Sequence, residues 1–441
     1  MSMRFLRVSA GIAVLLIAVL IASTTAASPV ATGPTSHFES ALLKAAITTK
    51  TVTVGKDPNI ELYDPDNKDM YVSNEGANTV SAISSTTYAV TSIKVGTDPL
   101  LLTYDATSKA VYVENFETSI SVISAANKVV KTIKFPSGTI PLGQFYDPGN
   151  GDVYALCVSS SGSVAEQINS ATYALKSVAL PTGALDMAYD NATLSLMVSS
   201  GSSNEVTAIS SSNVATKISL TAGVFPSFMV FDPHDSDMYI ADTGEGTHGF
   251  TKTGNVSVLS SSNKIIATIK VGAYPTIPWY DPANFEIYQI NTGIPTGTTY
   301  PASTVSLIGT ANTVVKTLTV GKEAVVAGYD PKNSEMYISC PRSNLTYAIT
   351  SANAITAKVA TKQYATAAEY DPALGDMLAI GFTSFLGAST ADTLVTVIPS
   401  TNTGTSTVTL GEGPVGGAGY NPTDSGFWVV NTGTTTVTVI L

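Results

Sequence analysis

The 441-residue chain contains few charged, imidazole or thiol side chains. Asp, Glu, Lys and Arg make up 12% of it, about half of the roughly 25% usual in soluble domains. It has two cysteines and three histidines, whereas a transition-metal site needs several converging imidazoles or thiolates. Arginine occurs only at Arg4, Arg7 and Arg342, which argues against nucleic-acid readout, because that depends on Arg and Lys clusters. The composition predicts a neutral, hydroxyl-rich surface without a nucleic-acid partner.

Long apolar runs are also scarce. The run at residues 8–22 is about 15 residues long, short of the roughly 20 that span a bilayer. Two arginines precede it and small residues follow it, so residues 1–27 are typical of a secretory signal peptide, with an N-terminal membrane anchor as the alternative. Cleavage after Ala26 or Ala27 would agree with the small residues that signal peptidase sites contain. A short tether at 28–45 follows, and we expect an extracellular, cell-surface or periplasm-like location.

Sequence motifs of common enzymes are missing. The chain has no Gly-x-Ser-x-Gly elbow and no P-loop. Residues 411–416 match Gly-x-Gly-x-x-Gly, but they join two expected strands and open no helix, as a dinucleotide site requires. We therefore expect no cofactor and no catalytic residue from motifs alone.

What the chain does contain is one pattern in nine copies, an aromatic residue followed by Asp or Asn and usually by Pro. Successive copies lie 41 to 50 residues apart. Short β-type runs and turn residues fill each interval, which is typical of propeller blades rather than of helical repeats. The aromatic anchors are Tyr63, Tyr104, Tyr146, Tyr189, Phe231, Tyr280, Tyr329, Tyr370 and Tyr420.

The register inside each copy is fixed, because a large apolar or aromatic residue always stands eight positions after the anchor. This invariant spacing predicts a strand, a tight turn and a second strand. A third alternating run, such as residues 256–259, and a fourth, such as 265–271, complete a four-stranded antiparallel blade. The residues at the second position are Tyr71, Tyr112, Tyr154, Met197, Tyr239, Tyr288, Tyr337, Leu378 and Trp428.

The two ends of the repeat region, residues 46–441, predict a closed ring. The last repeat stops after its third strand, and an unassigned strand at residues 51–54 precedes the first anchor. Pairing of the two would complete the last blade and leave no strand edge open there. We expect an all-β, single propeller of nine blades, with eight blades or two smaller rings as alternatives.

Two residue types in the repeats could carry chemistry. Cys157 and Cys340 stand eleven residues after their anchors and four blades apart. A disulfide between them is not expected, because it needs Cα atoms within roughly 7 Å. We expect either small residues packed at a strand end or reactive free thiols. Paired acids such as Asp64 and Asp69 flank the turn in six repeats. We expect them to cap turns, with weak Ca²⁺ binding as the alternative.

Three insertions explain the long intervals, and each lies between the second and third strands, roughly at residues 242–255, 291–304 and 381–393. These loops share one face of the ring, and loops on a rigid scaffold often bind ligands. Tolerated surface insertion is the alternative. The candidate residues for a ligand or partner face are Asp242, Glu245, His248, Asn291 and Tyr300.

Three Asn-x-Ser/Thr sequences, at Asn191, Asn255 and Asn344, are candidate glycosylation sites in a secreted chain. Short motifs of this kind also arise by chance in Ser/Thr-rich sequence. They nevertheless agree with the expected location.

The segments Tyr71-Val-Ser-Asn74 and Tyr112-Val-Glu-Asn115, followed by Val-Ser-Val-Ile type strands and Val-Gly-x-x-Pro, resemble the YVTN family of β-propeller repeats. The resemblance covers roughly residues 46–441 and implies the fold. Members of that family are typically secreted or surface proteins of prokaryotes, including surface-layer-like proteins. The resemblance transfers no catalytic residue.

These observations favour a binding or scaffold propeller that contacts a surface protein, a carbohydrate or another copy of itself through its loop-rich face. The alternative is an enzyme of lactonase or lyase type acting near the central channel. A partner of a redox system is a third, weaker hypothesis, since the chain has no haem motif and no cluster of metal ligands.

Overall fold

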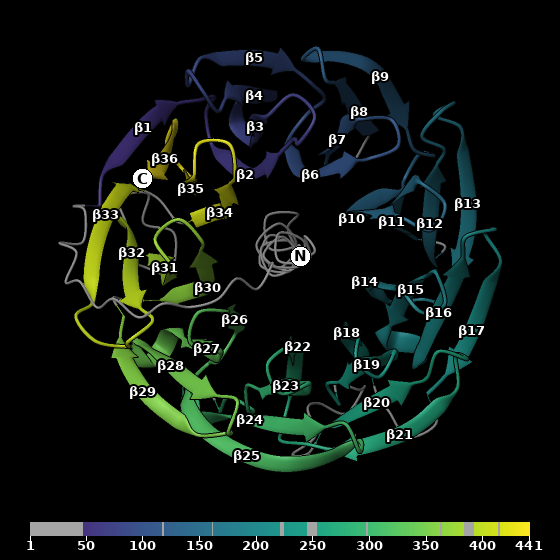
Figure 1. Cartoon of the computed structure of the whole chain (residues 1–441). Coiled ribbons are helices and arrows are strands. Elements are labelled where there is room, and N and C mark those ends of the chain that lie inside the picture. The colour runs from purple at the N-terminus through teal and green to yellow at the C-terminus, as the bar shows by residue number, and fades with distance from the viewer. Residues whose placement is uncertain are drawn as a thin grey trace, which may run out of the picture.

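Nine four-stranded antiparallel sheets are arranged around a central axis as the blades of one propeller (Figure 1). The structure, a computed structural model, describes residues 47–116, 119–160, 162–220, 225–244, 254–296, 299–361, 364–382, 392–412 and 415–441. The prediction of an all-β ring is confirmed, and nine blades rather than eight are present. The expected signal peptide and tether lie outside the described residues.

Each blade runs from an inner strand beside the axis to an outer strand on the circumference (Figure 1). Blade 1 consists of β2 (Pro58–Tyr63), β3 (Asp69–Asn74), β4 (Thr79–Ser84) and β5 (Val90–Lys94). Blade 2 consists of β6 (Pro99–Asp105), β7 (Ala110–Asn115), β8 (Ser119–Ser124) and β9 (Lys128–Lys134). Blade 3 consists of β10 (Ile140–Asp147), β11 (Asp152–Ser159), β12 (Gly162–Ile168) and β13 (Leu175–Leu180).

Blades 4 to 6 continue the ring. Blade 4 consists of β14 (Ala184–Asp190), β15 (Ser195–Ser200), β16 (Glu205–Ser210) and β17 (Ala215–Ser219). Blade 5 consists of β18 (Pro226–Asp232), β19 (Asp237–Asp242), β20 (Asn255–Leu259) and β21 (Ile265–Lys270). Blade 6 consists of β22 (Pro275–Asp281), β23 (Glu286–Asn291), β24 (Ala302–Gly309) and β25 (Thr313–Lys322). The long loops of blades 5 and 6 join their second and third strands, as expected.

Blade 7 consists of β26 (Val326–Asp330), β27 (Glu335–Cys340), β28 (Leu345–Thr350) and β29 (Ile355–Ala360). Blade 8 consists of β30 (Ala365–Asp371), β31 (Asp376–Phe382), β32 (Asp392–Pro399) and β33 (Ser406–Glu412). Blade 9 combines β34 (Val415–Asn421), β35 (Gly426–Asn431) and β36 (Thr436–Ile440) with β1 (Thr49–Thr53). Among the described residues, three 3₁₀ turns follow second strands: η1 (Glu75–Ala77), η2 (Gly201–Ser203) and η3 (Pro341–Ser343).

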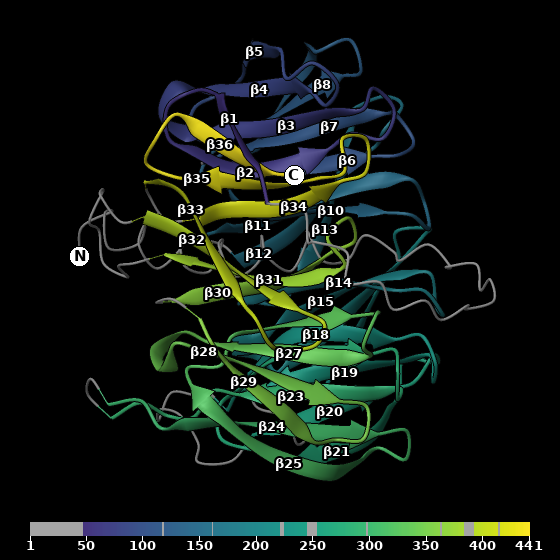
Figure 2. The ribbon, with the colours of Figure 1, turned by 60° about the vertical axis from the view of Figure 1, so that its left-hand side comes forward.

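Ring closure occurs in blade 9, where the first strand of the described chain joins the last. β1 pairs antiparallel with β36, with Thr49 opposite Ile440. The amide of Leu441 donates to the carbonyl of Thr48 at 2.8 Å. Figure 2 turns the side of the ring that carries β1 and β33 toward the viewer. The predicted pairing of the N-terminal strand with the last repeat is confirmed.

The Asp or Asn that follows each anchor has a local role. In blade 7 the amide of Lys332 donates to Asp330 Oδ1 at 2.8 Å, and in blade 1 the amide of Asp66 donates to Asp64 Oδ1 at 2.9 Å. An Asp at the start of a turn is favoured because its side chain bonds its own backbone two residues on. The turn-capping prediction is therefore confirmed for the first acid of each pair, while weak Ca²⁺ binding stays a prediction.

The second acid of the pair and the aromatic residue at the eighth position join neighbouring blades. In blade 7, Tyr337 donates its hydroxyl hydrogen to Asn402 Oδ1 at 2.8 Å, and Asn402 Nδ2 donates to Glu335 at 2.6 Å. Asn402 lies in the last turn of blade 8 with φ of 60°, a backbone region that Asn tolerates better than most residues. Tyr154 with Asn213 and Tyr239 with Asn312 repeat the contact.

The hydrophobic core is divided into layers between adjacent blades. One layer combines Tyr71 and Val80 of blade 1 with Leu102 and Val111 of blade 2. Each blade thus buries its faces only against its neighbours, as in other repeat proteins. Cys157 and Cys340 belong to two separate layers as fully buried free thiols, so no disulfide joins them.

The Val-Gly closure and the Asn that ends the second strand pack on each other. A Cβ atom on Gly96 would lie 2.5 Å from Cγ of Asn115. Asn115 in turn donates to Ser119 Oγ at 3.2 Å and Ser121 Oγ at 3.0 Å. Only glycine leaves room for this buried amide, which explains why the two elements of the repeat occur together.

Candidate functional site

Of the residues predicted for the ligand face, the structure describes three, which lie in the neighbouring blades 5 and 6. Asn291 and Tyr300 belong to the insertion of blade 6, and Asp242 ends β19 in blade 5. Asp242 is 1% exposed and accepts a hydrogen bond from Ser257 Oγ at 2.7 Å. Burial raises its pKa to about 7, so it is an internal residue rather than a surface ligand. Glu245 and His248 lie outside the described residues.

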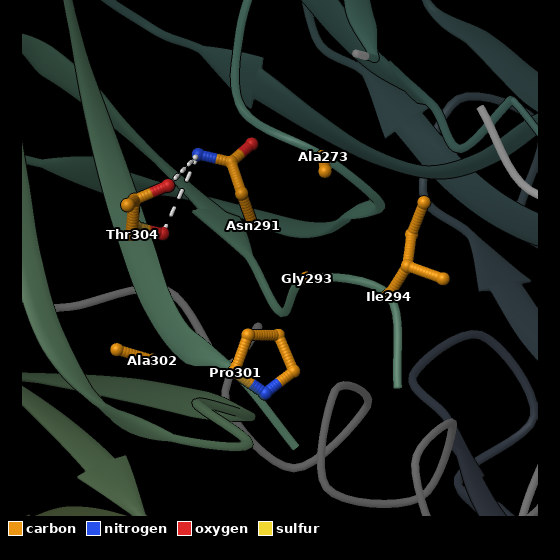
Figure 3. Close-up of a pocket in the computed structure, with 7 residues that line it drawn as sticks. All are labelled: Ala273, Asn291, Gly293, Ile294, Pro301, Ala302 and Thr304. Carbon is orange, nitrogen blue, oxygen red and sulfur yellow. Dashed lines mark hydrogen bonds between the residues drawn. The ribbon is translucent and has the colours of Figure 1, made fainter. Parts of the chain in front are cut away.

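A pocket of about 310 Å³ lies where the insertion of blade 6 meets the loop before β22. Gly293, with φ of 81°, and Pro301 bring the two arms of the insertion together, since a Cβ on Gly293 would lie 2.6 Å from Pro301 Cγ. Thr296 and Thr299 exchange backbone hydrogen bonds near the tip. The lining is mainly apolar (Figure 3) and consists of Ala273, Asn291, Gly293, Ile294, Pro301, Ala302 and Thr304.

Asn291 is the polar anchor of this pocket. Its Nδ2 donates to Thr304 Oγ1 at 3.2 Å and to Ser306 Oγ at 3.0 Å, while Oδ1 points away from Thr304 (Figure 3). Oδ1 is buried and accepts no hydrogen bond from the described residues, an arrangement that recurs at Asn74, Asn115 and Asn431. Asn291 is therefore first a blade-building residue, and a pocket opens beside it.

A charged and aromatic cluster lies on the same insertion. The guanidinium of Arg342, on η3 of blade 7, lies 3.9 Å from the ring centroid of Tyr300. Arg342 Nε lies 2.7 Å from Glu323 Oε2. Burial raises the pKa of Glu323, and the guanidinium partly opposes that shift. A guanidinium and the face of an aromatic ring attract each other. This cluster therefore connects the insertion of blade 6 with blade 7.

Sequence reasoning did not predict a role for Glu323 or Arg342. The available clue was that Arg342 is the one arginine beyond the N-terminal segment. It stands two residues after Cys340, at the position in blade 7 that follows the second strand. Its contact with Tyr300 depends on how two blades pack, which no local pattern reveals.

A second group of polar residues lies on the inner strands. Glu61 on β2 projects over the glycine-rich strand β34, because a Cβ on Gly417 would lie 2.1 Å from Glu61 Oε2. That oxygen is buried without a hydrogen-bond partner in the described part of the chain. Burial raises the pKa of Glu61 to about 8, and the nearby Glu369 on β30 adds to the shift. Burial also raises the pKa of Glu369 to about 8.

The two glutamates come from blades 1 and 8, which flank blade 9, and the charge of Glu369 adds to the rise in the pKa of Glu61. Carboxyl groups with pKa values of about 8 can donate or accept a proton near neutral pH, so this pair is a candidate acid and base. Sequence reasoning missed it, because the residues stand at different offsets from their anchors and are 308 positions apart. Within the described ranges, no group of three or more His, Cys, Asp or Glu side chains could bind a metal ion.

The three sequons lie at different depths. Asn191 is exposed in the turn between β14 and β15, and Asn344 is exposed after η3 with φ of 53°. Asn255 begins β20 and is partly buried. Glycosylation of all three stays a prediction. No helix among the described residues is long and apolar enough to cross a membrane.

Comparisons with known proteins support the fold. No protein-family model and no curated protein sequence matches the chain. Among solved structures, the Dos1 propeller is 10% identical with a TM-score of 0.54, over 89% of this chain and 94% of that one. A dihydro-haem d1 dehydrogenase, NirN, is 13% identical with a TM-score of 0.52, over 69% of this chain. This chain spans 66% of the length of NirN.

Virginiamycin B lyase from Staphylococcus aureus is 12% identical with a TM-score of 0.45, over 89% of this chain and 99% of that one. At such low identity the likeness of the Dos1 propeller and of NirN concerns the fold alone. The chain is a nine-bladed β-propeller, and its distant structural neighbours include a dehydrogenase and a lyase.

Proposed function

We propose that this protein is an extracytoplasmic binding propeller that contacts a carbohydrate or protein partner at the cell surface through its loop-rich face. The observation that carries the proposal is the pocket beside Asn291, which the insertion of blade 6 builds on a rigid ring. Ligand sites are mostly apolar concave surfaces with a few fixed polar groups. The pocket has this character, and the Tyr300 and Arg342 cluster fixes the same insertion.

The N-terminal sequence, the sequons and the hydroxyl-rich composition support a location outside the cytoplasm. The resemblance to YVTN repeats supports the same location. Self-association into a surface layer is one form that this binding could take. Negative-stain images of native envelope fractions would then show rings in an ordered array, whereas single rings in the medium would point to a soluble partner.

The pocket is tested with Ile294→Glu, which places a carboxylate in the apolar lining. We expect binding to a neutral oligosaccharide on a glycan array to fall about tenfold or more, because the ligand would have to desolvate the new charge. Binding isotherms of the folded variant measure this. The matched control is Leu194→Glu, at a leucine that is 52% exposed in the turn between β14 and β15. Equal losses in both variants, or no glycan binding by the wild type, would count against a carbohydrate site here.

The second candidate is an enzyme acting beside the inner strands, and the carboxyl pair of Glu61 and Glu369 favours it. A general acid or base works best with a pKa near the operating pH, and burial gives both groups that property. We expect any lactone hydrolysis or elimination by the wild type to fall about 100-fold or more in Glu369→Gln. Initial rates between pH 5 and 9 measure this. Activity unchanged in that variant would exclude the pair.

A further inference from the structure

The charges of this protein are separated between two regions of the ring. Seventeen of its 33 acidic residues lie in the turns that join first and second strands or at the strand ends that flank those turns. Eleven of its 22 lysines and arginines lie instead on outer strands. They are Lys50, Lys94, Lys128, Lys131, Lys134, Lys176, Lys217, Lys270, Lys316, Lys322 and Lys358.

The outer strands form the circumference of the ring, which we call the rim: β1, β5, β9, β13, β17, β21, β25, β29 and β33 (Figure 1). All eleven rim lysines are exposed. Eight of the nine rim strands contain no Asp or Glu, and the exception is Glu412 at the end of β33. Among the described residues, no rim lysine forms an ion pair. The rim is thus a positive band on a chain of net charge −11.

Protection of sheet edges explains part of this pattern. Charged side chains on an edge strand, lysine especially, prevent pairing with other chains. Edge protection therefore accounts for lysines on the rim, but it does not account for the exposed aliphatic side chains that lie beside them.

The other exposed side chains of the rim narrow the class of partner. Six exposed aliphatic residues lie on the same strands: Val90, Val129, Val130, Leu175, Ile266 and Val315. Threonine hydroxyls stand among them, for example Thr91, Thr132 and Thr317. Lysine pairs with carboxylate or sulfate groups, hydroxyls bond to hydroxyls, and aliphatic side chains pack against the C–H faces of sugar rings. An acidic polysaccharide offers all three.

The shape of the rim favours a flexible polymer over a membrane. The outer strands lie on a convex circumference (Figures 1 and 2), so a flat bilayer would meet one or two blades at a time. A chain can bend along the band and contact lysines of successive blades. β9, which carries Lys128, Lys131 and Lys134, has the highest density of positive charge and lies between the lysine-bearing strands β5 and β13.

We propose that the rim is a binding surface for an acidic polysaccharide, centred on β9 and separate from the loop-rich face. The binding is electrostatic, so it weakens as salt screens the charges. It does not involve the pocket beside Asn291. A propeller with both surfaces could retain an anionic polymer on its circumference while its loop-rich face contacts another partner.

The test uses the full chain and immobilised hyaluronate, a carboxylated polysaccharide, with neutral dextran as the comparison surface. The rim variant carries Lys128→Gln, Lys131→Gln and Lys134→Gln. The control variant carries Lys56→Gln, Lys68→Gln and Lys332→Gln, three exposed lysines outside the rim, and has the same net charge. We expect the rim variant to bind hyaluronate about tenfold more weakly at low salt, since each exposed ion pair contributes modestly, and the control to bind within about twofold of wild type.

Equal losses in the two variants would overturn the proposal, because binding would then depend on overall charge. So would the absence of hyaluronate binding at low salt, or stronger binding to anionic phospholipid vesicles or duplex DNA than to hyaluronate. The Ile294→Glu variant separates the two surfaces. It should bind hyaluronate as the wild type does, whatever its effect on the glycan array.

Discussion

The free energy of unfolding should fall as the pH rises from about 4.5 to about 8, and Glu114→Gln should remove part of that decrease. Glu114 on β7 is fully buried, and neither of its carboxyl oxygens has a hydrogen-bond partner in the described residues. Burial raises its pKa from 4.5 to about 8. The folded protein therefore binds a proton in this pH range that the unfolded chain has released, so stability is full below pH 4.5 and is lost toward pH 8.

The expected size is roughly 3 to 5 kcal/mol for one such group, because one pKa unit corresponds to about 1.4 kcal/mol. Burial also raises the pKa values of Glu61 and Glu369 to about 8 and that of Asp186 to about 7, which adds to the decrease. Urea unfolding of wild type and Glu114→Gln at pH 4.5, 6.5 and 8.5 measures it. Glu205→Gln, at a partly buried acid on β16, is the matched control, and parallel pH profiles for Glu114→Gln and wild type would contradict the account.

The second large effect is expected from Gly328→Ala. Gly328 lies on the inner strand β26, where an added Cβ would lie 2.1 Å from the carbonyl oxygen of Ala368 on β30. The contact is with the backbone of the next blade, so no side-chain rotation can relieve it. Overpacking a core typically costs about 1–3 kcal/mol, and we expect a loss at or above the top of that range.

The matched control is Gly143→Ala on the inner strand β10. A Cβ there would find Met187 Cε at 3.9 Å as its nearest neighbour, an ordinary van der Waals contact. Thermal and urea unfolding, followed by circular dichroism, compare the two variants. Similar stabilities of Gly328→Ala and Gly143→Ala would contradict the prediction, because blades 7 and 8 would then have to move apart without a cost in stability.

Most of the fold was predictable because its signals are local and periodic. The fixed spacing between each aromatic anchor and the large residue eight positions later predicted a hairpin in each repeat. The strand at residues 51–54 predicted the ring closure that β1 and β36 form. The candidate site was predicted only in part. The insertion with Asn291 and Tyr300 does border a pocket and a charged cluster, whereas Asp242 is buried inside its blade.

The repeat, the four strands of each blade and the residues that cap the turns follow from the amino-acid sequence alone, since each depends on neighbours within about ten positions. Which distant side chains meet depends on how the blades pack. Arg342 reaches Tyr300 and Glu323, and Glu61 lies near Glu369, because adjacent blades pack and the ring closes. The positive rim has the same origin, since lysines about 40 residues apart become one band when every fourth strand lies on the circumference.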